Sequence, residues 1–89
     1  MARLDYGISD LVEAPAGATG ADALFQLGLM YSAGRDVELD LVVAHKWFNL
    51  AALRGNDDAK VYRMEIAREL SRQDVARAQK MAREWLRVN

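Results

Sequence analysis

Residues able to support acid–base, nucleophilic or metal chemistry are sparse in this chain. The 89 residues include one histidine, His45, and no cysteine. The residues four positions away on a helix, Leu41 and Asn49, provide neither a carboxylate nor a second imidazole, so His45 lacks partners for a metal site or a catalytic triad. We interpret His45 as a solvated side chain on a helix face, and we predict no catalytic residue, no metal site and no cofactor.

Two other patterns that can accompany catalysis have simpler interpretations here. Asp57 and Asp58 are adjacent, so on a helix they point in different directions and favour the positive N-terminal end of that helix rather than acting as an acid–base pair. Gly17, Thr19 and Gly20 lack the lysine that a phosphate-binding loop requires. The sequence therefore predicts a protein without enzymatic activity.

The composition indicates a small globular domain. Hydrophobic residues make up 52% of the chain and charged residues 28%, which is ordinary for a globular protein. No apolar run approaches the roughly 20 residues that span a bilayer, and the first residues do not have the pattern of a secretory signal. We expect a cytoplasmic protein with no membrane partner.

The charges are distributed unevenly along the chain. Residues 1–58 hold four basic and nine acidic side chains, a net charge of −5, whereas residues 59–89 hold eight basic and four acidic side chains, a net charge of +4. Such a split is common in short segments, but it is also compatible with attraction between the two ends, within one chain or between copies.

The chain divides into an N-terminal arm and a helical domain. Residues 1–19 contain the only proline, Pro15, and we expect a partly flexible arm there. The domain spans residues 20–89. Its first helix is predicted to be capped by Thr19, with Asp22 three residues later as in a capping box.

Two helices follow the arm in the prediction. The first ends at Gly34, which favours a left-handed turn, and the second covers residues 41–54 after a cap at Asp40 and ends at Gly55. The second helix is apolar on two faces, so we expect it to be covered on both sides. One face comprises Ala44, Trp47, Phe48, Ala51 and Ala52; the other comprises Val43, Leu50 and Leu53.

Two more helices complete the predicted domain. A third, over residues 57–70, follows a cap at Asn56 or Asp57, and a fourth follows Ser71, with Asp74 three positions on. The inward residues of the third are Ala59, Tyr62, Ile66 and Leu70. Those of the fourth are Val75, Ala78, Ala82, Trp85 and Leu86, opposite the basic residues Arg77, Lys80, Arg83 and Arg87.

These helices repeat a pattern. Ala44 and Trp47 recur at the same spacing as Ala82 and Trp85, and the helix starts marked by Ala23 and Ala59 lie 36 residues apart. A period in the thirties built from paired helices is typical of solenoids. Small residues allow helices to approach closely, and aromatic side chains fill the grooves beside them. We therefore predict an all-α fold of two stacked antiparallel hairpins.

The first hairpin resembles the Sel-one-like repeat (SLR) family, a relative of the tetratricopeptide repeats, and is most similar to bacterial members. Residues 20–55 carry the full repeat; residues 56–89 resemble a degenerate capping hairpin, because Met64 and Ala67 replace the expected Gly and Tyr. The resemblance implies a short right-handed solenoid that acts as a non-catalytic adaptor or scaffold. It rests on Ala23, Leu27, Gly28, Met30, Tyr31, Gly34, Val37, Asp40, Ala44, Trp47, Phe48, Ala51, Ala52, Gly55 and Ala59.

Apolar residues outside the packing stripes are the candidates for binding a protein or peptide. Phe25 and Leu29 on the first helix, with Val61 and Met64 on the third, would form a shallow groove if first helices line the concave face. The N-terminal arm or a second copy of the chain could cover the same residues, so a homo-oligomer is an alternative. Nucleic-acid binding by the basic residues of the fourth helix is less favoured, since no aromatic side chain lies among them.

Overall fold

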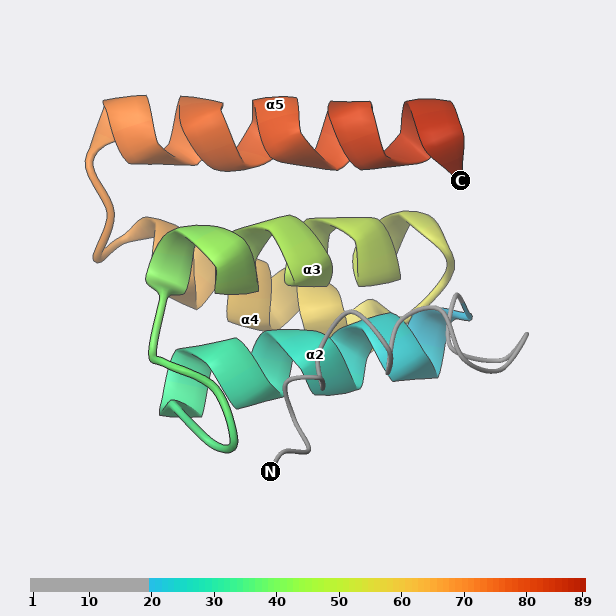
Figure 1. Ribbon diagram of the computed structural model, residues 1–89, viewed down its shortest axis with the longest axis horizontal. Coiled ribbons are helices and arrows are strands. Elements are labelled where there is room, and N and C mark those ends of the chain that lie inside the picture. The colour runs from blue at the N-terminus through green and yellow to red at the C-terminus, as the bar shows by residue number, and fades with distance from the viewer. Residues whose placement is uncertain (1–19) are drawn as a thin grey trace.

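The computed structural model describes residues 20–89, which form four α-helices and no strand (Figure 1). The helices are α2 (Ala21–Ala33), α3 (Leu41–Leu53), α4 (Asp57–Ala67) and α5 (Arg72–Val88). Successive helices run in opposite directions, so the predicted all-α fold of two hairpins is confirmed. The arm predicted at residues 1–19 lies outside the described residues.

Helix α3 is the centre of the fold. It packs against α2, α4 and α5, whereas α4 and α5 do not pack closely against each other (Figure 1). This arrangement follows from the two apolar faces of α3, each of which needs a cover. The prediction that α3 is covered on two sides is confirmed. The prediction that Leu53 belongs to a covered face is wrong, because this side chain lies at the helix end and is 63% exposed.

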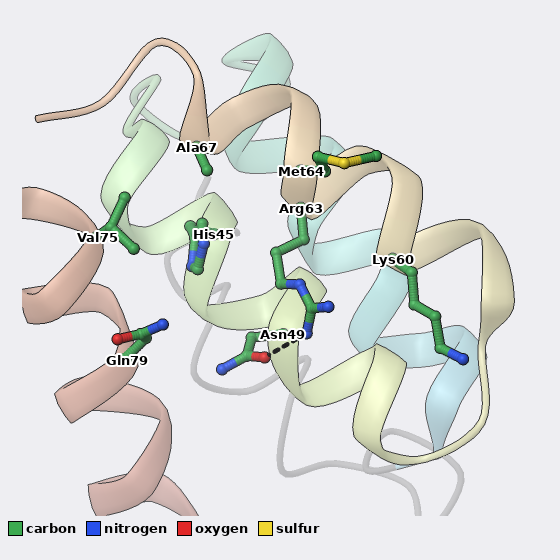
Figure 2. A pocket seen from close by; sticks show the side chains of 8 residues that line it. All are labelled: His45, Asn49, Lys60, Arg63, Met64, Ala67, Val75 and Gln79. Carbon is green, nitrogen blue, oxygen red and sulfur yellow. Dashed lines mark hydrogen bonds between the residues drawn. The ribbon is translucent and has the colours of Figure 1, made fainter. Parts of the chain in front are cut away.

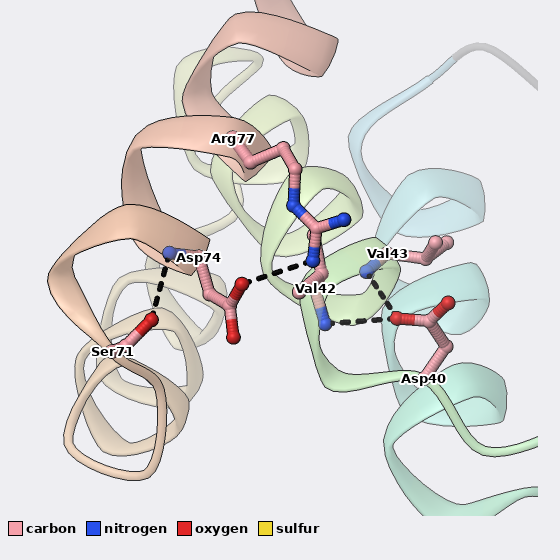
Figure 3. Close-up of polar contacts among 6 residues, drawn as sticks. All are labelled: Asp40, Val42, Val43, Ser71, Asp74 and Arg77. Atoms are coloured by element: carbon pink, nitrogen blue, oxygen red, sulfur yellow. Dashed lines mark hydrogen bonds and ion pairs between the residues drawn. The ribbon is translucent and has the colours of Figure 1, made fainter.

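The loop between α2 and α3 begins and ends at residues whose local conformation or hydrogen bonds fix the helix ends. Gly34 follows α2 with a φ of 68°, a left-handed conformation that glycine adopts without strain. Asp40 then caps α3, because its Oδ1 accepts hydrogen bonds from the backbone N–H groups of Val42 and Val43 at 3.0 and 3.1 Å (Figure 3). The predicted helix end and cap are therefore both confirmed.

The start of α2 differs from the prediction. Gly20 occupies the N-cap position without a side-chain hydrogen bond, and Thr19 lies outside the described residues. The predicted pairing of Asp22 with Thr19 is therefore not described, and Oδ1 of Asp22 accepts a hydrogen bond from Nδ2 of Asn56, 3.1 Å away. Asn56 also caps α4 by accepting from the N–H of Ala59, so it links the starts of two helices.

Helix α4 is shorter than expected, ending at Ala67 rather than at residue 70. Residues 68–70 tighten into i→i−3 hydrogen bonds, a common way for a helix to satisfy its last carbonyl groups. The chain can then reach the extended conformation of Ser71, whose hydroxyl accepts from the N–H of Asp74 at 3.0 Å and caps α5 as predicted (Figure 3).

The core contains most of the small and aromatic residues that the repeat pattern singles out. Gly28 lies so close to Phe48 that a Cβ at this position would be 2.5 Å from two carbons of the Phe48 ring. Ala23 and Tyr31 are half-buried. Gly55 has a φ of 107° just after α3. The buried members of the cluster are Leu24, Leu27, Met30, Ala44, Trp47, Phe48, Leu50, Ala51, Ala52, Ala59, Ile66 and Ala82.

Two residues predicted to point inward are instead substantially exposed. Tyr62 on α4 and Leu86 on α5 each expose 39% of their surface. The ring of Tyr62 lies against that of Phe25 at the edge of the core. Leu86 lies in the last turn of α5. Within residues 20–89, no helix has the length and apolar character needed to cross a bilayer.

Candidate functional site

The four residues of the predicted groove do not form one free surface. Phe25 is half-buried, with its ring centroid 5.7 Å from that of Phe48 and 5.2 Å from that of Tyr62. Leu29 is also half-buried, and both residues pack against the core. The α2 half of the predicted groove therefore contributes to internal packing, because the Tyr62 ring from α4 covers Phe25.

The α4 half of the predicted groove is accessible. Val61 is 49% exposed and Met64 is 53% exposed. These residues are three positions apart on one helix, so their side chains are neighbours on its surface. Val61 and Met64 are below called the α4 apolar pair. The exposure of the α4 apolar pair agrees with its predicted place outside the packing stripes, and its role in binding stays a prediction.

An open hollow lies beside this pair. Figure 2 shows it between α4 and α5, with α3 beneath. It arises because both helices pack against α3 without closing against each other. This α4–α5 cleft has a volume of about 590 Å³ and is lined by His45, Asn49, Lys60, Arg63, Met64, Ala67, Val75 and Gln79.

The lining of the cleft carries positive charge without a carboxylate. Arg63 and Lys60 both come from α4 and are one turn apart. Arg63 donates from Nη1 to Oδ1 of Asn49 over 2.8 Å, a neutral partner that fixes the guanidinium against α3 (Figure 2). Lys60 lies 3.4 Å from Asp57, but both side chains are mostly exposed, so this ion pair stabilises little.

His45 contradicts the expectation of a solvated side chain. It is only 2% exposed, because α4 and α5 flank it on α3. Its Nδ1 is buried and forms no hydrogen bond with a described residue. Burial lowers the pKa of His45, and the positive charge of Arg63 lowers it further, so the imidazole is neutral near pH 7.

This arrangement suits binding better than acid–base catalysis. A guanidinium and an ammonium group attract an anion, and Met64, Ala67 and Val75 offer apolar contact beside them. No group of three or more His, Cys, Asp or Glu side chains that could hold a metal ion occurs within residues 20–89.

The basic residues of α5 are separate from the cleft lining. Arg77, Lys80, Arg83 and Arg87 are all exposed, as predicted for the outer face of the helix. Arg77 pairs with Asp74 at 2.9 Å within the same helix (Figure 3). Trp85 is half-buried against Trp47, so it belongs to the packing of α5 on α3, as expected.

Comparison with known proteins identifies the first hairpin. The family model of the Sel1 repeat matches residues 21–56, which cover α2, α3 and the N-cap of α4. The resemblance of the first hairpin to this repeat is thereby confirmed, whereas its similarity to bacterial members stays a prediction. Residues 57–89 lie outside this match, so their role as a degenerate capping hairpin stays a prediction. No curated protein and no solved structure matches the chain.

Proposed function

The chain carries one Sel1 repeat, at residues 21–56, and we propose that it is a non-catalytic module that binds a partner protein on its α4 side. Sel1 repeats generally mediate protein–protein interactions. The observation that supports the α4 side is the exposure of about half of the surface of Val61 and Met64 beside an open cleft. Apolar side chains next to a hollow are typical of a surface that a partner covers.

The other faces of the described fold favour this choice. On α2, Phe25 and Leu29 are engaged with the core. On α5, the exposed outer face is mainly basic, with exposed apolar side chains only in the last turn, at Leu86 and Val88, and its Trp85 contacts Trp47. Helix α3 is enclosed by the other three helices. Helix α4 therefore offers both apolar contact and a concave neighbour for a protein ligand.

Self-association remains the alternative function. A second copy could cover the α4 apolar pair, and the opposite net charges of residues 1–58 and 59–89 would favour contact between copies. Light scattering at high micromolar concentration separates the two proposals. A stable dimer that becomes monomeric on Met64→Glu supports self-association, whereas a monomer supports a different protein as the partner.

The proposed function is tested by capture followed by reconstitution. Wild-type protein, Met64→Glu and the control Lys80→Glu are immobilised and exposed to extract from cells that express the chain. We expect a protein that is retained by wild type and by Lys80→Glu but lost with Met64→Glu. The captured protein is then purified, and its direct binding to the three variants is measured by calorimetry.

The control fits because Lys80 is exposed on α5, away from the α4 apolar pair. Met64 is also exposed, so its replacement should leave the fold intact, which circular dichroism checks. A captured protein that binds Met64→Glu as tightly as wild type would exclude the α4 side as the binding surface.

A further inference from the structure

The α4–α5 cleft has a charge that nothing in its lining neutralises. Arg63 forms no ion pair with any residue in the described range 20–89; its guanidinium donates a hydrogen bond to the neutral amide of Asn49. Lys60 lies one turn away on the same helix, with its ammonium group largely exposed. Asp57, 3.4 Å from Lys60, offsets part of its charge, but Arg63 has no such partner and the lining itself holds no carboxylate, so the cleft keeps a positive potential.

A buried polar group faces the same hollow. Figure 2 shows His45 on α3 between Ala67, Val75 and Gln79 at the floor of the cleft. His45 is 2% exposed and its Nδ1 has no hydrogen-bond partner among the described residues. Unpaired buried polar atoms are uncommon in native proteins because they lose hydration without compensation. The floor of the cleft therefore holds an imidazole whose hydrogen-bonding capacity the described residues leave unsatisfied at Nδ1.

Three of the remaining lining residues are apolar, and the other two are the neutral amides Asn49 and Gln79. Ala67 and Val75 flank His45, and the flexible thioether side chain of Met64 lies at the α4 rim. The volume of about 590 Å³ is within the range of sites that hold ligands larger than a simple ion. The lining thus combines groups that attract an anion with walls that accept aliphatic atoms.

From this combination we propose that the α4–α5 cleft binds an aspartate or glutamate side chain of a peptide segment in the partner protein. Arg63 and Lys60 bind the carboxylate, His45 provides a further polar contact, and Val75, Ala67 and Met64 contact the aliphatic atoms of that segment. The inference rests on the proposed function, since it assigns the chemistry of the partner at the same α4 surface.

An acidic peptide fits the cleft better than nucleic acid does. A guanidinium group matches the geometry of a single carboxylate through two parallel hydrogen bonds. Single-stranded nucleic acid is bound mainly by aromatic stacking along a basic groove, and the lining contains no Phe, Tyr or Trp. Charge complementarity therefore selects an acidic protein segment as the occupant.

The test uses random dodecapeptides displayed on phage and selected on the immobilised full chain. Enriched peptides are synthesised with a fluorescein label, and their affinities are measured by fluorescence polarisation. The proteins are wild type, Arg63→Gln, Lys60→Gln and the matched control Lys80→Gln. Each peptide is also made with its Asp or Glu replaced by Asn or Gln.

We expect enriched peptides to contain an acidic residue whose replacement weakens binding about tenfold to hundredfold, the scale of a hydrogen bond to a charged group. Arg63→Gln should weaken binding to the same degree, and it should have no further effect on the neutral peptide. Lys80→Gln should change the affinity less than twofold. Lys60→Gln provides a second test if Arg63→Gln does not fold, because Lys60 is exposed.

Three results would overturn the inference: no peptide is enriched, the enriched peptides lack acidic residues, or acidic peptides bind all four proteins equally. None of these results contradicts the proposed function, which is tested separately by comparing how the captured protein binds wild type and Met64→Glu. If that partner binds through Met64 but is insensitive to Arg63→Gln and Lys60→Gln, the α4 surface is correct and its acidic ligand is wrong.

Discussion

The rings of Trp47 and Trp85 meet edge to face, with centroids 5.8 Å apart and planes at 82°. This contact joins the central helix α3 to the final helix α5, and the geometry is one that aromatic pairs favour. Trp47 is 5% exposed, while Trp85 is half-buried. The pair therefore holds α5 in the position that forms one wall of the α4–α5 cleft.

Replacing Trp47 by alanine should lower the free energy of unfolding by about 3–5 kcal/mol, as for other large core truncations. That loss approaches the whole stability of a domain of this size. Urea unfolding followed by circular dichroism measures it. Leu53→Ala is the control: this side chain is 63% exposed, so the change should stay within about 0.5 kcal/mol. Equal effects of the two substitutions would show that Trp47 is not a core residue.

Gly28→Ala should destabilise the fold although alanine is the better helix former. A Cβ at position 28 would lie 2.5 Å from the Phe48 ring, and such overpacking costs about 1–3 kcal/mol, more than the gain of about 1 kcal/mol in helix propensity. In a Phe48→Leu background the same substitution should cost less, because the ring is absent. Thermal unfolding of the four proteins measures this coupling; a stabilising Gly28→Ala in wild type contradicts the close approach.

The cap of α3 gives a third prediction. Asp40→Ala removes the oxygen that accepts from Val42 and Val43, and we expect a loss of about 1 kcal/mol in the free energy of unfolding. Asp40→Asn should retain most of the stability, since an amide oxygen can accept the same hydrogen bonds. Denaturant midpoints of the three proteins check this, and an equal loss in both variants would assign the effect to charge rather than to capping.

Stability should fall as the pH drops below the ordinary pKa of histidine, about 6.5. The pKa of His45 is lowered in the folded state, first by burial and then by Arg63. Between the folded and unfolded pKa values the unfolded chain binds more protons, so the folded state loses stability with falling pH until the folded pKa is passed.

This pH effect can be isolated because His45 is the only histidine. The free energies of unfolding at pH 7.5 and pH 5.5 are compared for wild type and His45→Gln. The difference between the two pH values should be smaller in the variant, which cannot titrate at this position. The same difference in both proteins would show that His45 is not buried in a neutral form.

Much of the fold could be predicted because the helix-capping residues and the spacing of small and aromatic residues in the sequence match the helix ends and contacts of the structure. Gly34 and Asp40 end and start helices by backbone chemistry that depends on few residues. The small residues of α3 and the aromatic residues beside them indicate its central position. The recurrence of Ala44 and Trp47 as Ala82 and Trp85 correctly anticipates that both tryptophans contribute to the core, where they contact each other.

The candidate site was predicted only in part because it depends on the spacing between helices. Helical periodicity places His45 among polar residues of α3, and nothing local shows that α4 and α5 flank it. The local pattern around Phe25 likewise does not show that Tyr62 of another helix lies against its ring. No motif in the sequence marks Arg63 as a binding residue. Only its spacing of three from Lys60 and from Ile66 indicates that it lies at the edge of the inward face of α4.

The most direct test of the proposed α4 binding surface is a map of amide chemical shifts. The isotope-labelled chain is titrated with its purified partner, and shifts are assigned along the four helices. We predict that the largest changes fall on α4 around Val61 and Met64 and on the residues that line the α4–α5 cleft. Changes confined to the outer face of α5, around Lys80 and Arg87, would contradict the account.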